Sequence, residues 1–212
     1  MVHDTKTTLL QTIKTEIPYN RIYNRLGFRK YSTDLHETEK KKIDSIINSA
    51  VLLVELKAVY TVFKSVSFAS QSIITFDSKY EFQSEGFCDM MSRAVSCALF
   101  AVTAGEKIVE ARDMLMKNNK MSESVIYDAV GSELAEEGAE FVHDFINKLI
   151  VRQGLVVTKR RYSPGYGDMK LENQKAIFSI LQPERIGISL TPSFLMTPEK
   201  SVTAFIGVEE QL

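Results

Sequence analysis

The sequence predicts an α+β fold with a mostly antiparallel sheet. Three observations carry this prediction. Residues 122–150 repeat apolar side chains at helical spacing, 58–68 and 71–76 are rich in β-branched and aromatic residues, and 95–102 form an apolar run of strand length. Helical and strand patterns are intermixed without strict β-α alternation, which favours this class over a parallel α/β sheet.

The first part of the chain predicts an arm followed by two helices. Residues 6–16 suit an edge strand or arm, and 20–26 suit a short helix that Gly27 ends. Asp34 and Glu37 have the spacing of a capping box, so a longer helix is expected from there to about residue 56. Its predicted buried stripe is Ile43, Ile46, Ile47, Ala50, Val51 and Val54.

Two neighbouring strands are predicted at 58–68 and 71–76, and they are candidates to pair. Residues 95–102 read as a central strand covered on both faces. Thr103 and Glu106 form a second capping-box pattern that would open a helix to Lys117. Asn118 and Asn119 then make a turn.

The helix at 122–150 is predicted from the longest regular pattern in the chain. Its apolar stripe is Ile126, Val130, Leu134, Phe141, Phe145 and Leu149. Gly131 and Gly138 are seven positions apart on one face, and each lowers helix stability by up to about 1 kcal/mol relative to alanine, so another segment must approach closely there.

Glu136 lies on a different strip of this helix. The strip also carries Ala129, Ser132 and His143, so a carboxylate stands among mostly small side chains. Two interpretations remain open from the pattern: the strip faces water, or it lines a site.

The C-terminal part predicts a helix at 173–181, an extended stretch at 186–190 and a closing strand at 202–208, with two proline-bearing bends between them. No repeat, low-complexity tract or linker divides the chain. We therefore expect one domain over residues 1–212, with 1–30 as an N-terminal arm.

The composition is that of an ordinary globular protein, with 44% hydrophobic and 25% charged residues and a net charge of −1. This charge balance argues against a nucleic-acid partner. Neither a membrane span nor a secretory signal is predicted, so a cytoplasmic location is expected. Cys88 and Cys97 lack metal-ligand spacing and are expected to be buried thiols, and we predict no metal site.

The stretch RRYSPGYGDMKLENQ, residues 160–174, suits a rigid ligand clamp. Pro164 fixes one φ angle, while Gly165 and Gly167 permit positive φ and close approach of a ligand to the backbone. Arg161 can grip a carboxylate through two parallel hydrogen bonds, and Tyr166 offers a flat face and a hydroxyl. The alternative is a sharp surface turn with a solvent-facing arginine.

Several blocks resemble the S-adenosylmethionine-binding activation domain of cobalamin-dependent methionine synthase. RYSPGY at 161–166 is similar to the RxxxGY motif of that family. LAEEGAEFVH at 134–143 resembles the helix before the motif, and LTPSFLMTPEKSVTAFIG at 190–207 resembles the closing segment. DAVGSE at 128–133, GYGDMKLENQ at 165–174 and RLGFRK at 25–30 resemble stand-alone versions of the domain.

The resemblance implies a bent antiparallel sheet with flanking helices and a role in rescuing an oxidised cofactor. In the family, a one-electron donor such as flavodoxin reduces inert cob(II)alamin, and S-adenosylmethionine methylates the product. Exergonic methyl transfer thereby draws the unfavourable reduction forward. The implied partner is the cobalamin-binding module of methionine synthase or another corrinoid protein, and the domain itself supplies positioning rather than catalytic residues.

The resemblance also implies roles for individual residues. Arg161 would hold the ligand carboxylate, and Glu136 would hold its ammonium group or balance the sulfonium charge. Gly165 and the backbone of Gly167 and Asp168 would line the ligand. Tyr166 would stand at the mouth of the site, facing the cobalamin module.

Two alternatives come from other classes of protein. One keeps the fold without the ligand, as an interaction protein that caps or stabilises a corrinoid protein. The other is an unrelated small-molecule enzyme that uses Glu136 or His143 as a base.

Overall fold

The computed structural model describes residues 6–28 and 36–211. A five-stranded antiparallel sheet lies at its centre, with strand order β1-β2-β6-β10-β7. These strands are β1 (Thr8–Leu10), β2 (Lys57–Val62), β6 (Ser96–Thr103), β7 (Leu155–Val157) and β10 (Ser201–Glu210). The predicted α+β class with an antiparallel sheet is confirmed.

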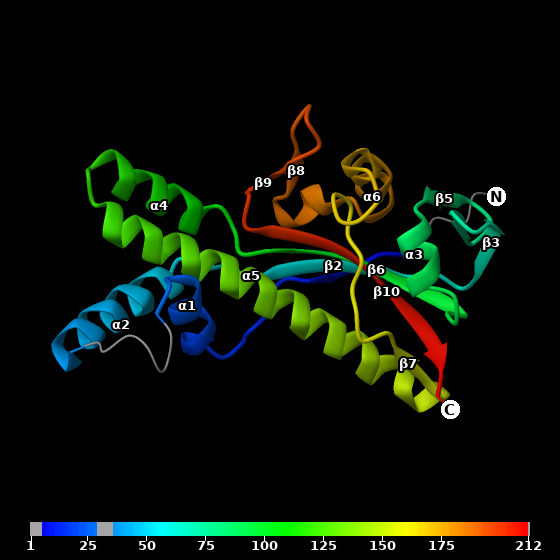
Figure 1. Cartoon of the computed structure of the whole chain (residues 1–212), viewed down its shortest axis with the longest axis horizontal. Helices are drawn as coiled ribbons and strands as arrows, with labels where there is room; N and C mark the ends of the chain where they lie inside the picture. Colours follow the sequence, from blue (N-terminus) through cyan, green and yellow to red (C-terminus); the bar gives the residue numbers. More distant parts are fainter. Residues whose placement is uncertain (1–5, 29–35, 212) are drawn as a thin grey trace.

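Helices cover both faces of this sheet. The long helix α5 crosses one face diagonally, together with α1, α2 and α4, and α3 and α6 lie on the other face (Figure 1). Their bounds are α1 (Tyr19–Arg25), α2 (Glu37–Val51), α3 (Glu85–Met90), α4 (Lys107–Lys117), α5 (Met121–Ile150) and α6 (Gln174–Leu181).

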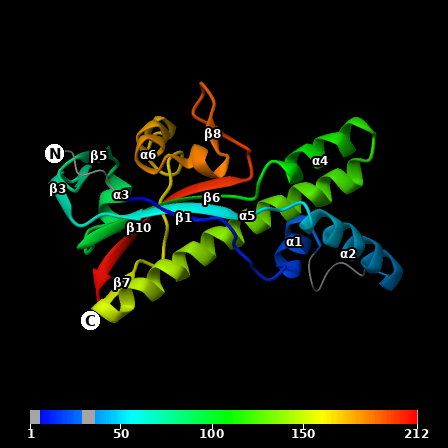
Figure 2. The ribbon, with the colours of Figure 1, turned by 180° about the vertical axis from the view of Figure 1, so that it is seen from behind.

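Two small sheets flank the centre on the α6 side. One contains β3 (Val66–Ser70), β4 (Ile73–Phe76) and β5 (Tyr80–Gln83), and the other contains β8 (Ser189–Leu190) and β9 (Met196–Thr197). Figure 2 shows both from behind, on the opposite side of the sheet from α5. Short 3-10 helices occur at Val151–Gln153, Leu171–Asn173 and Pro183–Ile186.

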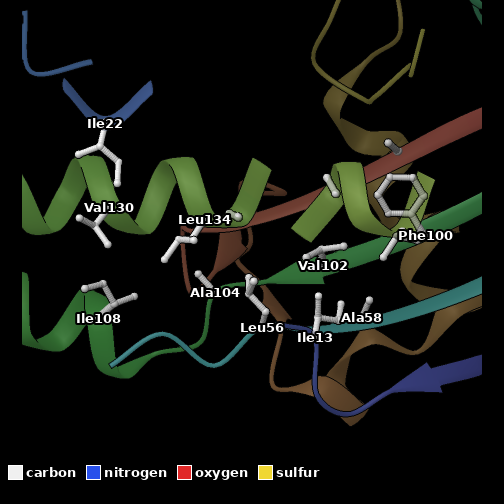
Figure 3. Close-up of a cluster of buried hydrophobic side chains, with 14 of the residues drawn as sticks. Ile13, Ile22, Leu56, Ala58, Phe100, Val102, Ala104, Ile108, Val130 and Leu134 are labelled. Atoms are coloured by element: carbon white, nitrogen blue, oxygen red, sulfur yellow. The ribbon is translucent and has the colours of Figure 1, made fainter. Parts of the chain in front are cut away.

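Successive side chains of each strand point to opposite faces of the sheet, so the sheet separates two hydrophobic cores. In β6, Phe100 and Val102 face α5, whereas Leu99 and Ala101 face α6. The core under α5 appears in Figure 3, where Val130 and Leu134 of the helix lie beside Ile108, Val102 and Ile22. Every residue of β6 is buried, as predicted for a central strand covered on both faces.

The N-terminal segment is packed rather than free. Ile13 and Ile22 belong to the α5-side core, and β1 pairs with the edge of β2. Gly27, with φ +87, follows α1 as predicted. Asp34 lies outside the described residues; α2 begins at Glu37 behind His36, whose side chain makes no capping hydrogen bond.

The predicted end of α2 near residue 56 is wrong, since the helix ends at Val51. Glu55 donates its N–H to the Ala104 carbonyl at 2.9 Å, and the Leu56 carbonyl accepts from Ile13 at 3.0 Å. The chain is therefore already extended there to enter β2.

The strand predicted at 58–68 is two strands in different sheets. Asp77 Oδ1 accepts hydrogen bonds from the backbone N–H groups of Lys64 and Ser65, at 2.7 and 3.0 Å, and so stabilises the break between β2 and β3. The predicted pairing with the 71–76 stretch is found between β3 and β4.

The capping box predicted at Thr103 and Glu106 is wrong, because Thr103 is the last residue of β6. Its hydroxyl accepts from Gly105 N at 3.0 Å, and α4 starts at Lys107 behind Glu106. The predicted end of this helix at Lys117 and the turn at Asn118 and Asn119 are confirmed.

Helix α5 runs as predicted, but its buried stripe differs towards the C-terminus. Steps of four residues drift around a helix of 3.6 residues per turn. Phe141 and Leu149 are therefore exposed, while Val142 and Ile146 are buried in their place. The glycine prediction is confirmed: a Cβ at Gly138 would lie 2.8 Å from Val102 Cγ1 of β6.

Candidate functional site

A cleft of about 890 Å³ lies beside the first residues of β10. It is enclosed by α5, by the segment from Arg160 to Tyr166, and by α3 and α6. Figure 1 shows this segment crossing the edge of the sheet, from the side of α5 to the side of α6. The cleft therefore reaches both faces of the sheet.

The cleft exists because β10 is paired on this edge by single residues rather than by a strand. Phe205 exchanges two main-chain hydrogen bonds with Tyr162, at 2.8 and 3.0 Å, and the Thr203 carbonyl accepts from Ser163 Oγ at 2.6 Å. Strand β7 pairs only with residues 208–210 of β10. The edge at Ser201 to Thr203 consequently faces the cleft.

Arg161 and Glu136, both predicted as site residues, meet in this cleft. Arg161 Nη2 lies 2.8 Å from Glu136 Oε2, and the two side chains are 22% and 41% exposed. The strip of α5 that carries Glu136 therefore lines a hollow next to the clamp segment. The prediction of a solvent-facing arginine at 161 is wrong.

The other guanidinium terminus, Nη1 of Arg161, is buried and has no hydrogen-bond partner in the described part of the chain. A charged donor left in this way is unfavourable by a few kcal/mol unless a partner arrives. It is the type of donor that binds a carboxylate.

Tyr166 and Gly165 form the outer turn of the clamp. Tyr166 lines the cleft and is 71% exposed, in keeping with its predicted place at the mouth. Gly165 has φ +88 and donates its N–H to the Met169 carbonyl at 2.9 Å, so that donor is used inside the turn.

Asp168 does not line the cleft; its carboxylate is hydrogen-bonded at the start of α3. Its carboxylate accepts from Ser84 Oγ at 2.5 Å, from Glu85 N at 2.5 Å and from Tyr162 OH at 3.0 Å. The hydrogen bond from Ser84, followed by that from Glu85, lowers the pKa of Asp168 to about 2. The Asp168 carboxylate therefore caps the N-terminus of α3 from a distant part of the chain.

Several polar residues of the cleft were not predicted as site residues from the sequence. Gln174 at the start of α6 and Thr203 of β10 are 3% and 2% exposed, and both line the cleft. The available signal was weak: Ser201 and Thr203 are polar residues two apart in an otherwise apolar closing strand. The remaining lining residues include Gly86, Asp89, Met90 and Met196.

His143 lies in a neighbouring hollow with Lys159, Arg160 and Asp144. Burial, and then the charge of Arg161, lowers the pKa of His143. Glu136 is hydrogen-bonded to Arg161, so it is not available as a free base. His143 lies outside the cleft that holds this pair.

Among residues 6–28 and 36–211, no cluster of three His, Cys, Asp or Glu side chains is suited to a metal ion, and no helix has the length and apolarity to cross a bilayer. Cys88 and Cys97 are buried free thiols, as expected, and burial raises the pKa of both. Met91 is buried, whereas Met114 and Met116 are exposed because α4 buries only Ile108.

An α+β fold with a cation–anion pair in an open cleft at the sheet edge is typical of a domain that binds a small polar molecule. Residues 81–211 match the model of the vitamin B12 dependent methionine synthase activation domain. The chain belongs to this family, and the family predicted from its sequence blocks is confirmed.

Known proteins with similar sequences agree with this family assignment. The methionine synthases of Mycobacterium tuberculosis (strain ATCC 25618 / H37Rv) and Mycobacterium leprae (strain TN) are each 27% identical to it over 123 residues. Each alignment covers 50% of this chain and 10% of the relative. The chain thus matches a small part of these enzymes.

A solved structure of the MetH reactivation domain bound to AdoHcy has a similar fold. The TM-score is 0.70 at 17% sequence identity, and the match covers 97% of this chain and 79% of that one. At this identity the likeness establishes the fold, including the predicted antiparallel sheet with flanking helices.

Proposed function

We propose that this chain is a reactivation module that binds S-adenosylmethionine and presents its methyl group to reduced cobalamin on a partner protein. Membership of the activation-domain family supports this role. The similar reactivation domain solved with AdoHcy, which is S-adenosylmethionine without its methyl group, supports the ligand class. The proposed location is cytoplasmic.

One observation carries the ligand proposal: the buried, unpartnered Nη1 of Arg161 beside Glu136 in the cleft. An amino-acid tail has a carboxylate and an ammonium group on the same carbon. A guanidinium and a carboxylate 2.8 Å apart are the complement of that arrangement. Arg161 would hold the ligand carboxylate and Glu136 its ammonium group.

The other predicted site residues complete the proposal. Gly165, Gly167 and Asp168 would offer backbone along the ligand, and Tyr166 would contact the partner. For Gly165, Gly167 and Asp168 the support is sequence resemblance, because none of the three lines the cleft.

A bound sulfonium would supply a methyl cation equivalent to reduced cobalamin on the partner and would leave as the neutral thioether. The chain itself contributes orientation, and we assign it no catalytic residue. The partner would be the cobalamin-binding module of methionine synthase or another corrinoid protein, reached in trans. The electron would come from a flavodoxin-like donor.

Calorimetric titration with S-adenosylmethionine tests the proposal. The parent should bind, and Arg161→Ala should weaken binding by roughly tenfold or more, since a charged hydrogen-bond partner is lost. Arg152→Ala is the matched control, because Arg152 is an exposed arginine outside the cleft. If the parent chain does not bind S-adenosylmethionine, the proposed function is wrong.

A second candidate is the ligand-free interaction protein that caps a corrinoid protein. The observation in its favour is that Arg161 and Glu136 already bind each other. A pull-down with a cobalamin-binding module distinguishes the two candidate functions. The second candidate is supported if the chain does not bind S-adenosylmethionine and the module captures it equally well with and without that compound.

A further inference from the structure

The block DAVGSE at 128–133 has no part in the proposed ligand site, but it contacts the residue that precedes the cleft edge. Lys200 lies directly before Ser201, and its Nζ lies 2.7 Å from Asp128 Oδ1 of α5. A Cβ at Gly131, on the next turn of the helix, would lie 3.1 Å from Lys200 Cγ. One face of this block therefore holds the lysine side chain, with Asp128 binding its ammonium group and Gly131 leaving room for its stem.

Arg112 of α4 extends this contact into a network. Arg112 Nη1 lies 3.0 Å from the same Asp128 oxygen, and it also contacts Glu199 Oε1. Glu199 Oε1 in turn lies 3.1 Å from Lys200 Nζ. The side chains of Lys200 and Arg112 are only 12% and 14% exposed, so water and salt screen these ion pairs less than pairs at an open surface. The network ties α4 and α5 to the start of β10.

The start of β10 is paired through its main chain on one edge only, which makes a side-chain tie important there. On the β6 edge, the Lys200 carbonyl accepts from Ala104 N at 2.8 Å. On the other edge, residues 201–203 line the cleft, and the Thr203 carbonyl accepts from Ser163 Oγ of the clamp segment at 2.6 Å. A shift of this end of β10 would therefore move the segment that carries Arg161.

The helix that binds Lys200 also carries the acidic residue of the site. Asp128 and Glu136 both belong to α5, and their separation in the sequence corresponds to about 12 Å along the helix axis. Glu136 is on the helix wall of the cleft, and residues 201–203 are on the strand wall. The contact between Lys200 and Asp128 therefore helps to fix the distance between these two walls.

We infer that Lys200 is a positioning residue of the ligand site. Its ion pair with Asp128 holds the open edge of β10 against α5, and so keeps Arg161 and Glu136 at the separation that the ligand tail requires. Lys200 itself does not line the cleft, so its effect passes through the strand and the clamp segment rather than through ligand contact. This inference rests on the proposed function and deepens it, since it names what holds the site in shape.

Calorimetric titration with S-adenosylmethionine tests this role. Lys200→Met keeps most of the side-chain stem and removes the ammonium group, and it should weaken binding by roughly fivefold because the two walls are no longer tied together. Lys200→Arg keeps a cation that can reach Asp128 and should restore the affinity to within roughly twofold of the parent. A side chain that served folding alone would not change the affinity of the folded chain.

Lys107→Met is the matched control, since Lys107 forms an exposed ion pair with Glu55 and does not line the cleft. Urea unfolding of each variant shows whether the titrated chain is folded. If Lys200→Met does not fold, Asp128→Asn replaces it, because it removes the carboxylate charge from the helix side. In an Arg161→Ala background, Lys200→Met should weaken the remaining binding by less than roughly twofold, since the residue whose position it controls is absent.

The outcomes are distinct. The inference is supported if Lys200→Met weakens binding while Lys200→Arg and Lys107→Met keep the affinity of the parent. It is wrong, and the proposed function stands, if the parent binds S-adenosylmethionine and Lys200→Met binds it equally well. The same holds if Lys200→Arg does not restore the affinity, or if the loss is equally large with and without Arg161. If the parent does not bind S-adenosylmethionine, the proposed function and this inference are both wrong.

Discussion

The hydroxyl of Tyr162 limits which residues can stand at positions 86 and 167. A Cβ at Gly167 would lie 2.5 Å from this oxygen, and one at Gly86 would lie 2.7 Å from it. Gly167 also has φ +57. The sequence predicted Gly167 as a ligand-lining glycine, but contact with Tyr162 is sufficient reason for it.

Asp168 shows how the clamp segment is tied to the body of the protein. It joins the clamp to Ser84 and to the first backbone N–H groups of α3. A carboxylate at a helix N-terminus typically contributes about 1 kcal/mol, and its exposure here keeps the value near or below that figure. The capping contact should thus be a modest but measurable part of stability.

We predict that Asp168→Asn flattens the pH dependence of stability in acid. The folded pKa of about 2 lies below the ordinary value of 3.8, so the carboxylate stabilises the fold above about pH 4. This contribution is lost as the pH falls from about 4 to about 2. Urea unfolding midpoints of parent and variant across this range measure it; equal slopes would contradict the role.

At the level of single residues, sequence could predict the charged pair but not the buried contact between Gln174 and Thr203. Arg161 and Glu136 are 25 residues apart, and motif resemblance assigned both to one ligand. Gln174 and Thr203 lie in blocks that resemble the family, but the resemblance assigned neither a role, and their contact forms only where a helix and a strand meet in the folded chain. Their roles depend on tertiary packing.

At the scale of elements, α5 approaches its neighbours most closely at its two glycines. A Cβ at Gly138 would lie 2.8 Å from Val102 Cγ1 and 3.1 Å from Leu56 Cδ2, inside the buried core. A Cβ at Gly131 would lie 3.1 Å from Lys200 Cγ and 3.4 Å from Ile108 Cγ1, so it requires smaller shifts than a Cβ at Gly138. The same substitution should therefore destabilise the protein more at Gly138 than at Gly131.

We predict that Gly138→Ala destabilises the protein by about 1 to 2 kcal/mol, because core overpacking exceeds the gain in helix propensity. Gly131→Ala should change stability by less than about 1 kcal/mol, since its closest contact is 3.1 Å and the gain in helix propensity offsets a small shift there. Chemical denaturation of both variants measures the difference. A Gly138→Ala variant as stable as Gly131→Ala would show that the core under α5 can relax.

Element type was predicted better than element ends. The periodic pattern of α5 and the apolar run of β6 follow from side-chain spacing, and both are observed. The ends of α2 and the start of α4 are set by backbone hydrogen bonds to distant segments, such as Glu55 to Ala104. Capping patterns in a local window could not reveal those contacts, and α3, β5 and β7 lacked a clear pattern altogether.

At the scale of the whole molecule, the sheet separates two cores, and β2, β6 and β10 each contribute side chains to both. The α5-side core holds α1, α2 and α4, and the α6-side core holds α3 and the small β3-β4-β5 sheet. The cleft crosses between them at Ser201 to Thr203. A ligand seated there would contact elements from both sides, which links binding to the packing of the entire fold.

This arrangement predicts where a ligand slows amide hydrogen exchange. Saturating S-adenosylmethionine should protect the backbone amides of residues 160–174 and 201–204, because these segments border the cleft. A ligand stabilises the state that binds it, and this stabilisation grows with the logarithm of the ligand concentration. Helix α4 and the turn at Asn118 and Asn119 lie away from the cleft and serve as the internal control. The Arg161→Ala variant should lose the protection at the same ligand concentration. Protection confined to α4, or spread evenly over the chain, would contradict binding in this cleft, because a ligand held by Arg161 must first restrain the segment that carries this residue.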